Sequence, residues 1–420
     1  MNTPVQRVYN LVKRNPRLKL FLKNAYQAVH VLPSGKKSNT EAVAACAPGF
    51  FFGFHDKCPW NSDDTKLLAH RAPATEKERK RGVPVEIGYF DDVQLRHFTP
   101  LGTTRAWNWQ QGAMLQWDPI HGGVFYNDLS AEKTPRLNHI ASAGEAAKDF
   151  GPAAGAISPC GNYLAHISFY RFGTGLHGYE YQGVQEDEGN ENVPQETGGF
   201  SILARTNEGF TDTIHTVPIA QLRETNPLAS MDGAYHYVSH PQFSPDSNTV
   251  AFFHRWVHRG KRNETRLYFL NLTTHTLTAA DTGTMVSHFC WIDSHGILAF
   301  YEGKNGTDYY GVVHKDGSEK FPLTHPALAV DGHPCCHIPT GRIVTDTYPD
   351  KKRHQHLLYL PGIAPDPTVH PVAKLYAPFR FQELFRADLH PRWNRAGDRI
   401  AVDCSYAGRR SLAILPLEDA

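Results

Sequence analysis

The sequence predicts an all-β fold, a seven-bladed β-propeller with a short N-terminal helical extension. A hairpin-like unit recurs along the chain: an apolar residue, a polar turn and a strand of β-forming residues. The 34 glycines and 29 prolines suit a turn-rich β protein. Seven copies are centred on Trp60, Trp117, Ile157, Phe243, Trp291, Cys336 and Trp393. Their intervals are 57, 40, 86, 48, 45 and 57 residues, and three of the six fall within the ~40–50 residues of a propeller blade, so each copy predicts one blade.

Residues 1–40 form the predicted basic helical extension. Residues 1–37 contain eight Lys and Arg residues, and no acidic residue precedes Glu41. Pro16 is expected to separate two short helices. The segment lacks the uninterrupted apolar core of a signal peptide. Two interpretations stay open: a peripheral contact of residues 1–37 with an anionic membrane surface, or a helix docked on the main domain.

Residues 41–420 form the predicted propeller. The 86 residues between Ile157 and Phe243 include an acidic, Gly-rich insertion at 179–199. We expect this insertion to be a long loop between the second and third strands of the third blade, rather than part of an eighth blade. The last copy leaves room for only three strands before the chain stops. Residues 41–47 are therefore expected to supply the fourth strand and close the ring, which removes an exposed sheet edge.

The overall composition narrows the function. A net charge of +1 gives no basis for a nucleic-acid partner. The seven cysteines include no CxxC pair, which indicates reduced thiols in a reducing compartment. No apolar run approaches the ~20 residues of a transmembrane helix. We therefore expect a cytoplasmic protein, with the inner membrane face as an alternative because of the basic N-terminus.

Histidine recurs at one position of the repeat. The residues three positions before the central apolar residue are, in order, Lys57, Met114, Ala154, His240, His288, His333 and His390. The first strand of each propeller blade lines the central channel, so equivalent positions form a ring about the axis. The four histidines should therefore converge near the channel mouth. A single histidine there would more often be structural, but four at one position favour a functional role.

Charged and polar residues at the far end of each hairpin are expected to lie at the same mouth of the central channel. Arginines there suit bidentate binding of carboxylates, although charged rims are common on propellers of any function. Trp107, Gln110 and Gln111 suit sugar stacking and hydroxyl recognition, unless the tryptophan simply packs between blades. The candidate substrate-binding residues are His55, Arg71, Trp107, Gln110, Gln111, Arg171, Tyr348 and Arg392.

Two chemistries fit clustered imidazoles. Neutral imidazole nitrogens bind divalent metals, and the candidate ligands are His288, His333, Asp388 and His390. A histidine can also act as a general base. The two occur together in enzymes that cleave uronic-acid polymers by β-elimination. There a metal or an arginine neutralises the substrate carboxylate, and the base removes the adjacent C–H proton.

The segments SHPQFSPD, VSHFCW and DLHPRW resemble segments of oligogalacturonate lyases, which are seven-bladed propeller polysaccharide lyases, and the repeated turns resemble those of TolB-like propellers. The resemblance covers mainly blades four to seven. The other catalytic candidates on the hairpin of His240 are Arg255, a candidate anion clamp, and the adjacent His254. The resemblance implies His240 as the base. It also implies manganese or a similar divalent ion on His288 and His390. Where the family has a histidine and a glutamine ligand this chain has Asp388 and Phe385, so Asp388 and His333 would have to replace them.

Three functions follow from these patterns. The leading hypothesis is a lyase acting on an acidic, uronate-containing oligosaccharide or polysaccharide. The second is a non-catalytic propeller that binds a glycan or a protein on the same face. The third is a glycoside hydrolase, which usually needs two carboxylates. Its candidate carboxylates are Glu302, Asp346, Asp388 and Asp403.

Overall fold

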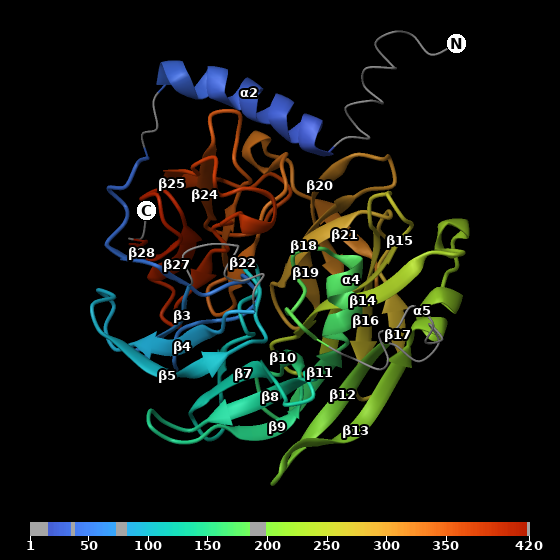
Figure 1. Ribbon diagram of the computed structural model, residues 1–420. Coiled ribbons are helices and arrows are strands. Elements are labelled where there is room, and N and C mark those ends of the chain that lie inside the picture. The colour runs from blue at the N-terminus through green and yellow to red at the C-terminus, as the bar shows by residue number, and fades with distance from the viewer. Residues whose placement is uncertain (1–15, 35–37, 73–81, 185–198, 418–420) are drawn as a thin grey trace.

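The seven predicted blades are seven separate four-stranded antiparallel sheets. The computed structural model describes residues 16–34, 38–72, 82–184 and 199–417, and the sheets lie in a ring around a common axis (Figure 1). The prediction of an all-β, seven-bladed propeller with a short N-terminal helix is confirmed. The innermost strands of neighbouring blades contact one another, as β10 contacts β14 and β22 contacts β26.

Blades 1 to 3 come from the first half of the chain. Blade 1 contains β2 (Phe50–Phe51), β3 (Leu67–Arg71), β4 (Val85–Phe90) and β5 (Phe98–Thr104). Blade 2 contains β6 (Gln116–Trp117), β7 (Val124–Leu129), β8 (Pro135–Ile140) and β9 (Lys148–Pro152). Blade 3 contains β10 (Ala154–Ile157), β11 (Tyr163–Ile167), β12 (Gly199–Thr206) and β13 (Gly209–Pro218).

Blades 4 to 7 complete the ring. Blade 4 contains β14 (Tyr235–Phe243), β15 (Thr249–Val257), β16 (Glu264–Asn271) and β17 (Leu277–Ala279). Blade 5 contains β18 (Val286–Trp291), β19 (Gly296–Glu302), β20 (Asp308–His314) and β21 (Glu319–Pro322). Blade 6 contains β22 (Cys335–His337), β23 (Arg342–Asp346), β24 (His354–Leu360) and β25 (His370–Tyr376). Blade 7 contains β26 (Arg392–Trp393), β27 (Arg399–Cys404), β28 (Ser411–Pro416) and β1 (Ala45–Pro48).

Burial explains why the repeat is visible in the sequence. The second strands, such as β15 and β19, are buried almost throughout because both faces of a blade pack against neighbouring blades. Outermost strands such as β17 and β21 have no fully buried residue. The strong apolar signal therefore marks each inner hairpin and fades toward the rim.

The ring is closed by the N-terminal side of the chain. Strand β1 pairs antiparallel with β28, from Ala45 opposite Ile414 to Pro48 opposite Ser411. Gly49, at φ +89°, turns the chain between β1 of blade 7 and β2 of blade 1. The expected donor strand at 41–47 thus lies at 45–48.

The long interval in the third blade holds an insertion and no further blade. Between β11 and β12 the chain forms helix α4 (Phe169–Gly175), which is capped by Ser168. Residues 185–198 of the expected 179–199 loop lie outside the described residues. Short helices elsewhere are α5 (Ile219–Glu224), η2 (Ala229–Met231), η3 (Pro326–Leu328) and η4 (Glu383–Phe385).

One helix, α2 (Pro16–Ser34), precedes the propeller and lies at the rim beside blade 6 (Figure 1). The described part of the helix begins at Pro16, so the prediction that Pro16 separates two short helices lies at the edge of the described residues and is not tested. Any helix before it would fall outside the described residues. No helix in the described ranges is long and apolar enough to span a membrane.

Candidate active site

Three of the equivalent repeat positions, two of them histidines, share an unusual backbone. Met114, His240 and His390, at equivalent repeat positions, have left-handed φ angles of 58°, 54° and 45°. The pairing register also shifts at this point in blades 3, 4 and 5. A bulge in the innermost strand re-aims one side chain, and such strained positions concentrate at functional sites. The repeat therefore turns the residue at this position away from the regular sheet.

Four imidazoles meet in one buried cluster. The ring centroid of His333 lies 4.2 Å from that of His288 and 4.3 Å from that of His390. His55, which follows β2 in blade 1, lies 5.4 Å from His333. We call His55, His288, His333 and His390 the imidazole cluster. All four side chains are at most 8% exposed.

Hydrogen bonds fix the orientation of three of these rings. His333 Nδ1 donates to Asp346 Oδ1 at 2.8 Å, and His288 Nδ1 donates to Asp331 Oδ1 at 3.0 Å. His55 Nδ1 donates to the carbonyl oxygen of Pro334 at 2.7 Å. With Nδ1 protonated, the Nε2 lone pair of each ring is free to accept or to bind a metal.

The free nitrogens face no protein partner. Within the described parts of the chain, Nε2 of His55, His333 and His390 is buried without a hydrogen bond. Asp388 adds an acceptor: its Oδ2 accepts from Arg386 Nε at 2.5 Å, while its Oδ1 is buried and unpartnered. Ligand atoms of His333, Asp388 and His390 lie within 4.8 Å of one another. Two imidazole nitrogens and one carboxylate oxygen form a donor set that suits a divalent cation.

Asp346 organises the cluster from behind. It accepts from the backbone N–H of His333 at 2.8 Å and from the backbone N–H of His390 at 3.0 Å, in addition to the His333 ring. A single carboxylate of blade 6 therefore positions the histidines of blades 6 and 7. Ser287 Oγ binds Asp331 in the same supporting manner at 2.5 Å.

Burial controls the charge of the cluster. Burial and the neighbouring imidazoles lower the pKa of His55 and His390 well below the ordinary value. Burial also lowers the pKa of His288, although Asp331 opposes the shift. Burial has the same effect on His333, but the charge and hydrogen bond of Asp346 outweigh it and raise its pKa. Most of the cluster is thus neutral near pH 7, the state in which imidazole binds metal.

Phe54 separates His240 from the cluster. The Phe54 ring lies 4.9 Å from His240 and 5.0 Å from His390. Phe172 of α4 and Tyr179 cover His240, with ring centroids 5.3 and 5.7 Å away. His240 Nδ1 is buried and has no partner among the described residues.

Arg255 is the cation beside His240. Burial and then the charge of Arg255 lower the pKa of His240 well below its usual range. The guanidinium stacks over Phe253 at 4.9 Å, and its Nε has no hydrogen-bond partner in the described structure. His240 and a guanidinium whose Nε is unpartnered in the described structure therefore both pack against Phe253 of blade 4.

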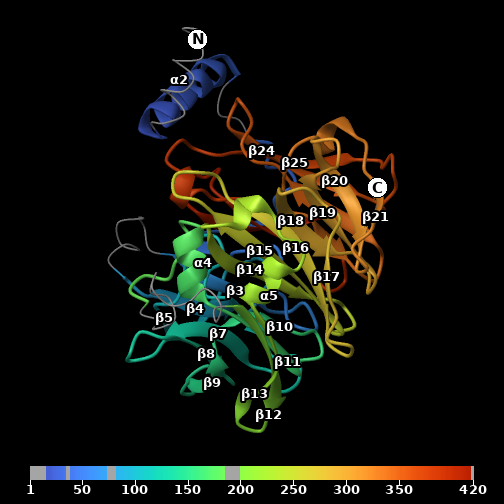
Figure 2. The ribbon, with the colours of Figure 1, turned by 90° about the vertical axis from the view of Figure 1, so that its right-hand side faces the viewer.

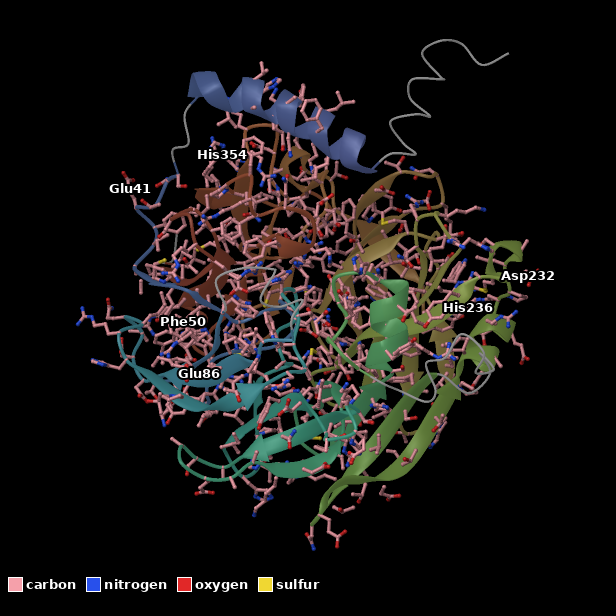
Figure 3. All side chains as sticks on the ribbon, viewed as in Figure 1. Glu41, Phe50, Glu86, Asp232, His236 and His354 are labelled. Carbon is pink, nitrogen blue, oxygen red and sulfur yellow. The ribbon has the colours of Figure 1, made fainter. Side chains whose placement is uncertain are left out.

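His254 does not join this pair, contrary to expectation. Successive residues of a strand point to opposite faces, so His254 points away from the face that carries Arg255. His254 Nε2 instead lies 2.9 Å from Nδ1 of His236, inside blade 4. Figure 3 places His236 well out from the centre of the ring. The structure thus places the His254 ring apart from His240 and Arg255, against His236.

The segment at 105–112 is buried packing rather than an exposed sugar platform. Trp107 Nε1 donates to the carbonyl oxygen of Val83 at 3.1 Å, and its ring meets Trp109 edge-on at 4.9 Å. Gln110 Nε2 donates to the carbonyl oxygen of Arg386 at 3.3 Å, and Gln111 is 4% exposed. These residues join blade 1 to the segment before blade 7 and present no open surface to a glycan.

The four remaining candidates have different surroundings. Arg392 is buried, donates to Asp403 Oδ1 at 3.1 Å and holds the Gly53 carbonyl oxygen at 2.6 Å, so its donors serve ring closure. Arg71 forms an exposed ion pair with Glu86, labelled near the rim in Figure 3. Arg171 is buried in α4, and its Nε and Nη2 have no described partner. Tyr348 borders the cluster, 5.5 Å from His333.

Sequence reasoning missed Phe54, Asp331 and Arg386. One signal could have found Asp331: it precedes His333 by two residues, as Asp388 precedes His390. No comparable signal marks Phe54, which becomes central only because β2 brings it beneath His240. Arg386 lies two residues before Asp388, and this spacing alone does not predict an ion pair.

Comparisons with known proteins support the fold. No protein-family model and no curated protein sequence matches the chain. The structure is similar to that of oligogalacturonate lyase from Vibrio parahaemolyticus, with a TM-score of 0.55, 11% identity and 92% of each chain covered. It is also similar to TolB from Acinetobacter baumannii (TM-score 0.38, 14% identity, covering 85% of this chain and 81% of TolB). The Swd1 β-propeller domain of Myceliophteria thermophila gives a TM-score of 0.48 at 9% identity, covering 88% of this chain and 98% of that domain. At 11% identity, the likeness to the oligogalacturonate lyase structure shows a shared propeller fold and nothing finer.

Proposed function

We propose that the protein is a lyase that cleaves a uronate-containing oligosaccharide or polysaccharide by β-elimination. The observation that carries the proposal is that His240 and Arg255 both pack against Phe253, beside an imidazole cluster in which Nε2 of His55, His333 and His390 has no hydrogen-bond partner in the described structure. The elimination needs a base and a positive charge at the substrate carboxylate, and both are present here.

His240 is the proposed base. It takes the proton from the carbon next to the carboxylate, the C–H electrons form a C=C bond, and the adjacent C–O bond breaks. The leaving oxygen then takes up a proton. Arg255 holds the carboxylate and stabilises the negative charge that develops on it. A carboxylate bound to Arg255 also offsets the charge that depresses the pKa of His240, so binding would raise the basicity of the imidazole.

The residues present also fit a divalent ion such as manganese. His333, Asp388 and His390 would hold it, and Asp346 and Arg386 would orient these ligands. When bound, the ion would supply a second positive charge for the substrate carboxylate. His288, which lies 4.2 Å from His333 between ring centroids, is the neighbouring candidate ligand.

The fold and the cysteines are compatible with this proposal. The fold is shared with a crystal structure of oligogalacturonate lyase, and the segments resembling that family carry His240, His288 and His390. All seven cysteines are free, which suits a reducing compartment, so we propose a cytoplasmic location. The substrate would then be an acidic glycan present on that side of the membrane.

The test is the ultraviolet absorbance of an unsaturated uronate product across a panel of uronate glycans. We expect product with the wild type and a loss of about 10²–10⁴-fold in His240→Asn, since that is the usual contribution of general base catalysis. Asn tolerates the left-handed φ of residue 240, so the variant should fold. Arg255→Gln should also fail, whereas Arg136→Gln, at an exposed ion pair, should retain activity. Absence of unsaturated product from every glycan would overturn the proposal, and new reducing ends without it would indicate hydrolysis.

A non-catalytic binding propeller is the second candidate, and the depth of the site favours it. His240, His333 and His390 are 4%, 1% and 2% exposed, so a glycan must displace Tyr179 or Tyr348 to reach them. A hydrolase has less support. Asp346 and Asp403 are already engaged in internal hydrogen bonds, which leaves few free carboxylates.

A further inference from the structure

We infer that helix α2 is a peripheral membrane-docking surface that lies on an anionic lipid bilayer. Three independent observations support this: the way the helix is anchored, the apolar face it leaves exposed, and the charge of the chain around it.

One face of α2 is anchored to blade 6. Gln27 is buried and its Nε2 donates to the carbonyl oxygen of Asp350 at 3.0 Å, in the loop between β23 and β24. Val31, one turn further on, is 5% exposed. After the helix, Ser38 Oγ accepts from the backbone N–H of Tyr376, and Asn39 bridges to Lys374. The helix is therefore held against the propeller by its own side chain and by the chain that follows it.

The opposite face of α2 is apolar and exposed to solvent. Phe21, Leu22, Tyr26 and Val29 are 66%, 45%, 55% and 65% exposed. At 100° per residue these four positions fall on one side of the helix, turned away from Gln27 and Val31. A propeller has no need of such a stripe, and large exposed apolar side chains gathered on one helix face mark an interaction surface.

The sequence that contains the helix is basic, which favours an anionic partner. Residues 1–40 carry eight Lys or Arg and no acidic residue, whereas residues 41–420 carry 35 basic and 42 acidic residues. The basic charge is thus concentrated in the segment that contains α2, although the whole chain is nearly neutral. A helix with an apolar face in a basic segment lies in the plane of an anionic bilayer, with the apolar side chains in the headgroup region.

The geometry would hold one side of the propeller against the membrane. In Figure 2, α2 and α4 lie toward the same side of the ring, and α4 carries Phe172, which covers His240. The Asp350 loop that anchors α2 also carries Tyr348, at the border of the imidazole cluster. Docking through α2 would therefore bring the candidate active site close to the lipid headgroups.

Flotation of the full-length protein with lipid vesicles tests this inference. We expect binding to phosphatidylcholine vesicles that contain phosphatidylglycerol, at least tenfold weaker binding to pure phosphatidylcholine, and release at high salt. The double variant Phe21→Glu/Val29→Glu should lose at least tenfold in binding. Both side chains are exposed, so its thermal unfolding should match that of the wild type. Val330→Glu, at another exposed apolar residue, is the matched control and should bind like the wild type.

Three results would overturn the inference. The first is equal binding of the wild type and the double variant, and the second is equal binding to neutral and anionic vesicles. The third is a wild type that forms a dimer in solution, separated into monomers by the double variant, without vesicle binding. That last result would assign the apolar face to a contact between two copies of the chain.

Discussion

The arginine–carboxylate pairs Arg392–Asp403 and Arg71–Glu86 should differ widely in their contribution to the free energy of unfolding. Asp403 Oδ1 accepts from Arg392 Nη2 at 3.1 Å, and its oxygens also accept from the backbone N–H groups of Phe52 and Gly53, both at 2.9 Å. The side chains of Arg392 and Asp403 are each 1% exposed. These bonds tie blade 7 to blade 1 where the ring closes. The substitution Asp403→Asn removes the carboxylate charge with little change in shape.

The expected cost follows from the burial of the pair. Removing one partner leaves the Arg392 charge buried without compensation, which costs about 3–5 kcal/mol. The matched variant Glu86→Gln removes the same charge from the exposed pair with Arg71, where an ion pair is worth at most about 1 kcal/mol. Asp403→Asn should therefore lower the free energy of unfolding several times more than Glu86→Gln.

Guanidinium unfolding followed by tryptophan fluorescence measures both variants, and the midpoint shift multiplied by the m-value gives the change in the free energy of unfolding. Equal small shifts in the two variants would refute the structural role of the Arg392–Asp403 pair. If the Asp403→Asn variant is as stable as the wild type but loses glycan binding, Arg392 would instead be a substrate-binding residue.

Three further predictions concern stability. Burial lowers the pKa of His70 to about 3 from the usual 6.5, so the folded protein prefers the neutral ring; this contributes to stability above pH 6.5 and is lost as the pH falls toward 3. His70→Gln should flatten the dependence of the unfolding free energy on pH in this range. An unchanged slope would contradict the assignment. Deleting residues 41–50 removes β1 and should lower the melting temperature sharply, whereas deleting residues 1–14 should not; equal melting curves would show that β1 does not close the ring. Trp107→Ala should cost about 3–5 kcal/mol through a core cavity, and a stable variant with weaker glycan binding would oppose the buried role.

The fold could be predicted from the sequence because a propeller repeats the same four-stranded unit seven times. Each inner hairpin is buried on both faces, so each produces the same apolar pattern in the sequence, and the number of these patterns gives the number of blades. The same symmetry predicts that His240, His288, His333 and His390 converge. The last three do meet, whereas Phe54 lies between them and His240. The position of β1 followed from the physical need to cover an open edge.

The surroundings of the other candidate site residues could not be predicted, because contacts between blades do not repeat along the sequence. His254 and Arg255 are adjacent in sequence, and only the register of β15 decides which of them faces His240. The sequence does not distinguish Arg71 from Arg392, whose acidic partners differ: Glu86 is half-buried on the neighbouring strand, and Asp403 is fully buried. The burial of Trp107 depends on a loop whose packing leaves no repeating pattern in the sequence.

A claim of the account that can be measured directly is that His333 and His390 of the imidazole cluster, together with Asp388, hold a divalent ion. Elemental analysis of the protein, after incubation with manganese and removal of free ion, tests this most directly. We predict one ion per chain in the wild type, loss of the ion in His333→Ala, and retention in His215→Ala, which removes a histidine from an exposed pair with His275. A wild type that binds no manganese, or a His333→Ala variant that binds as much as the wild type, would contradict the account.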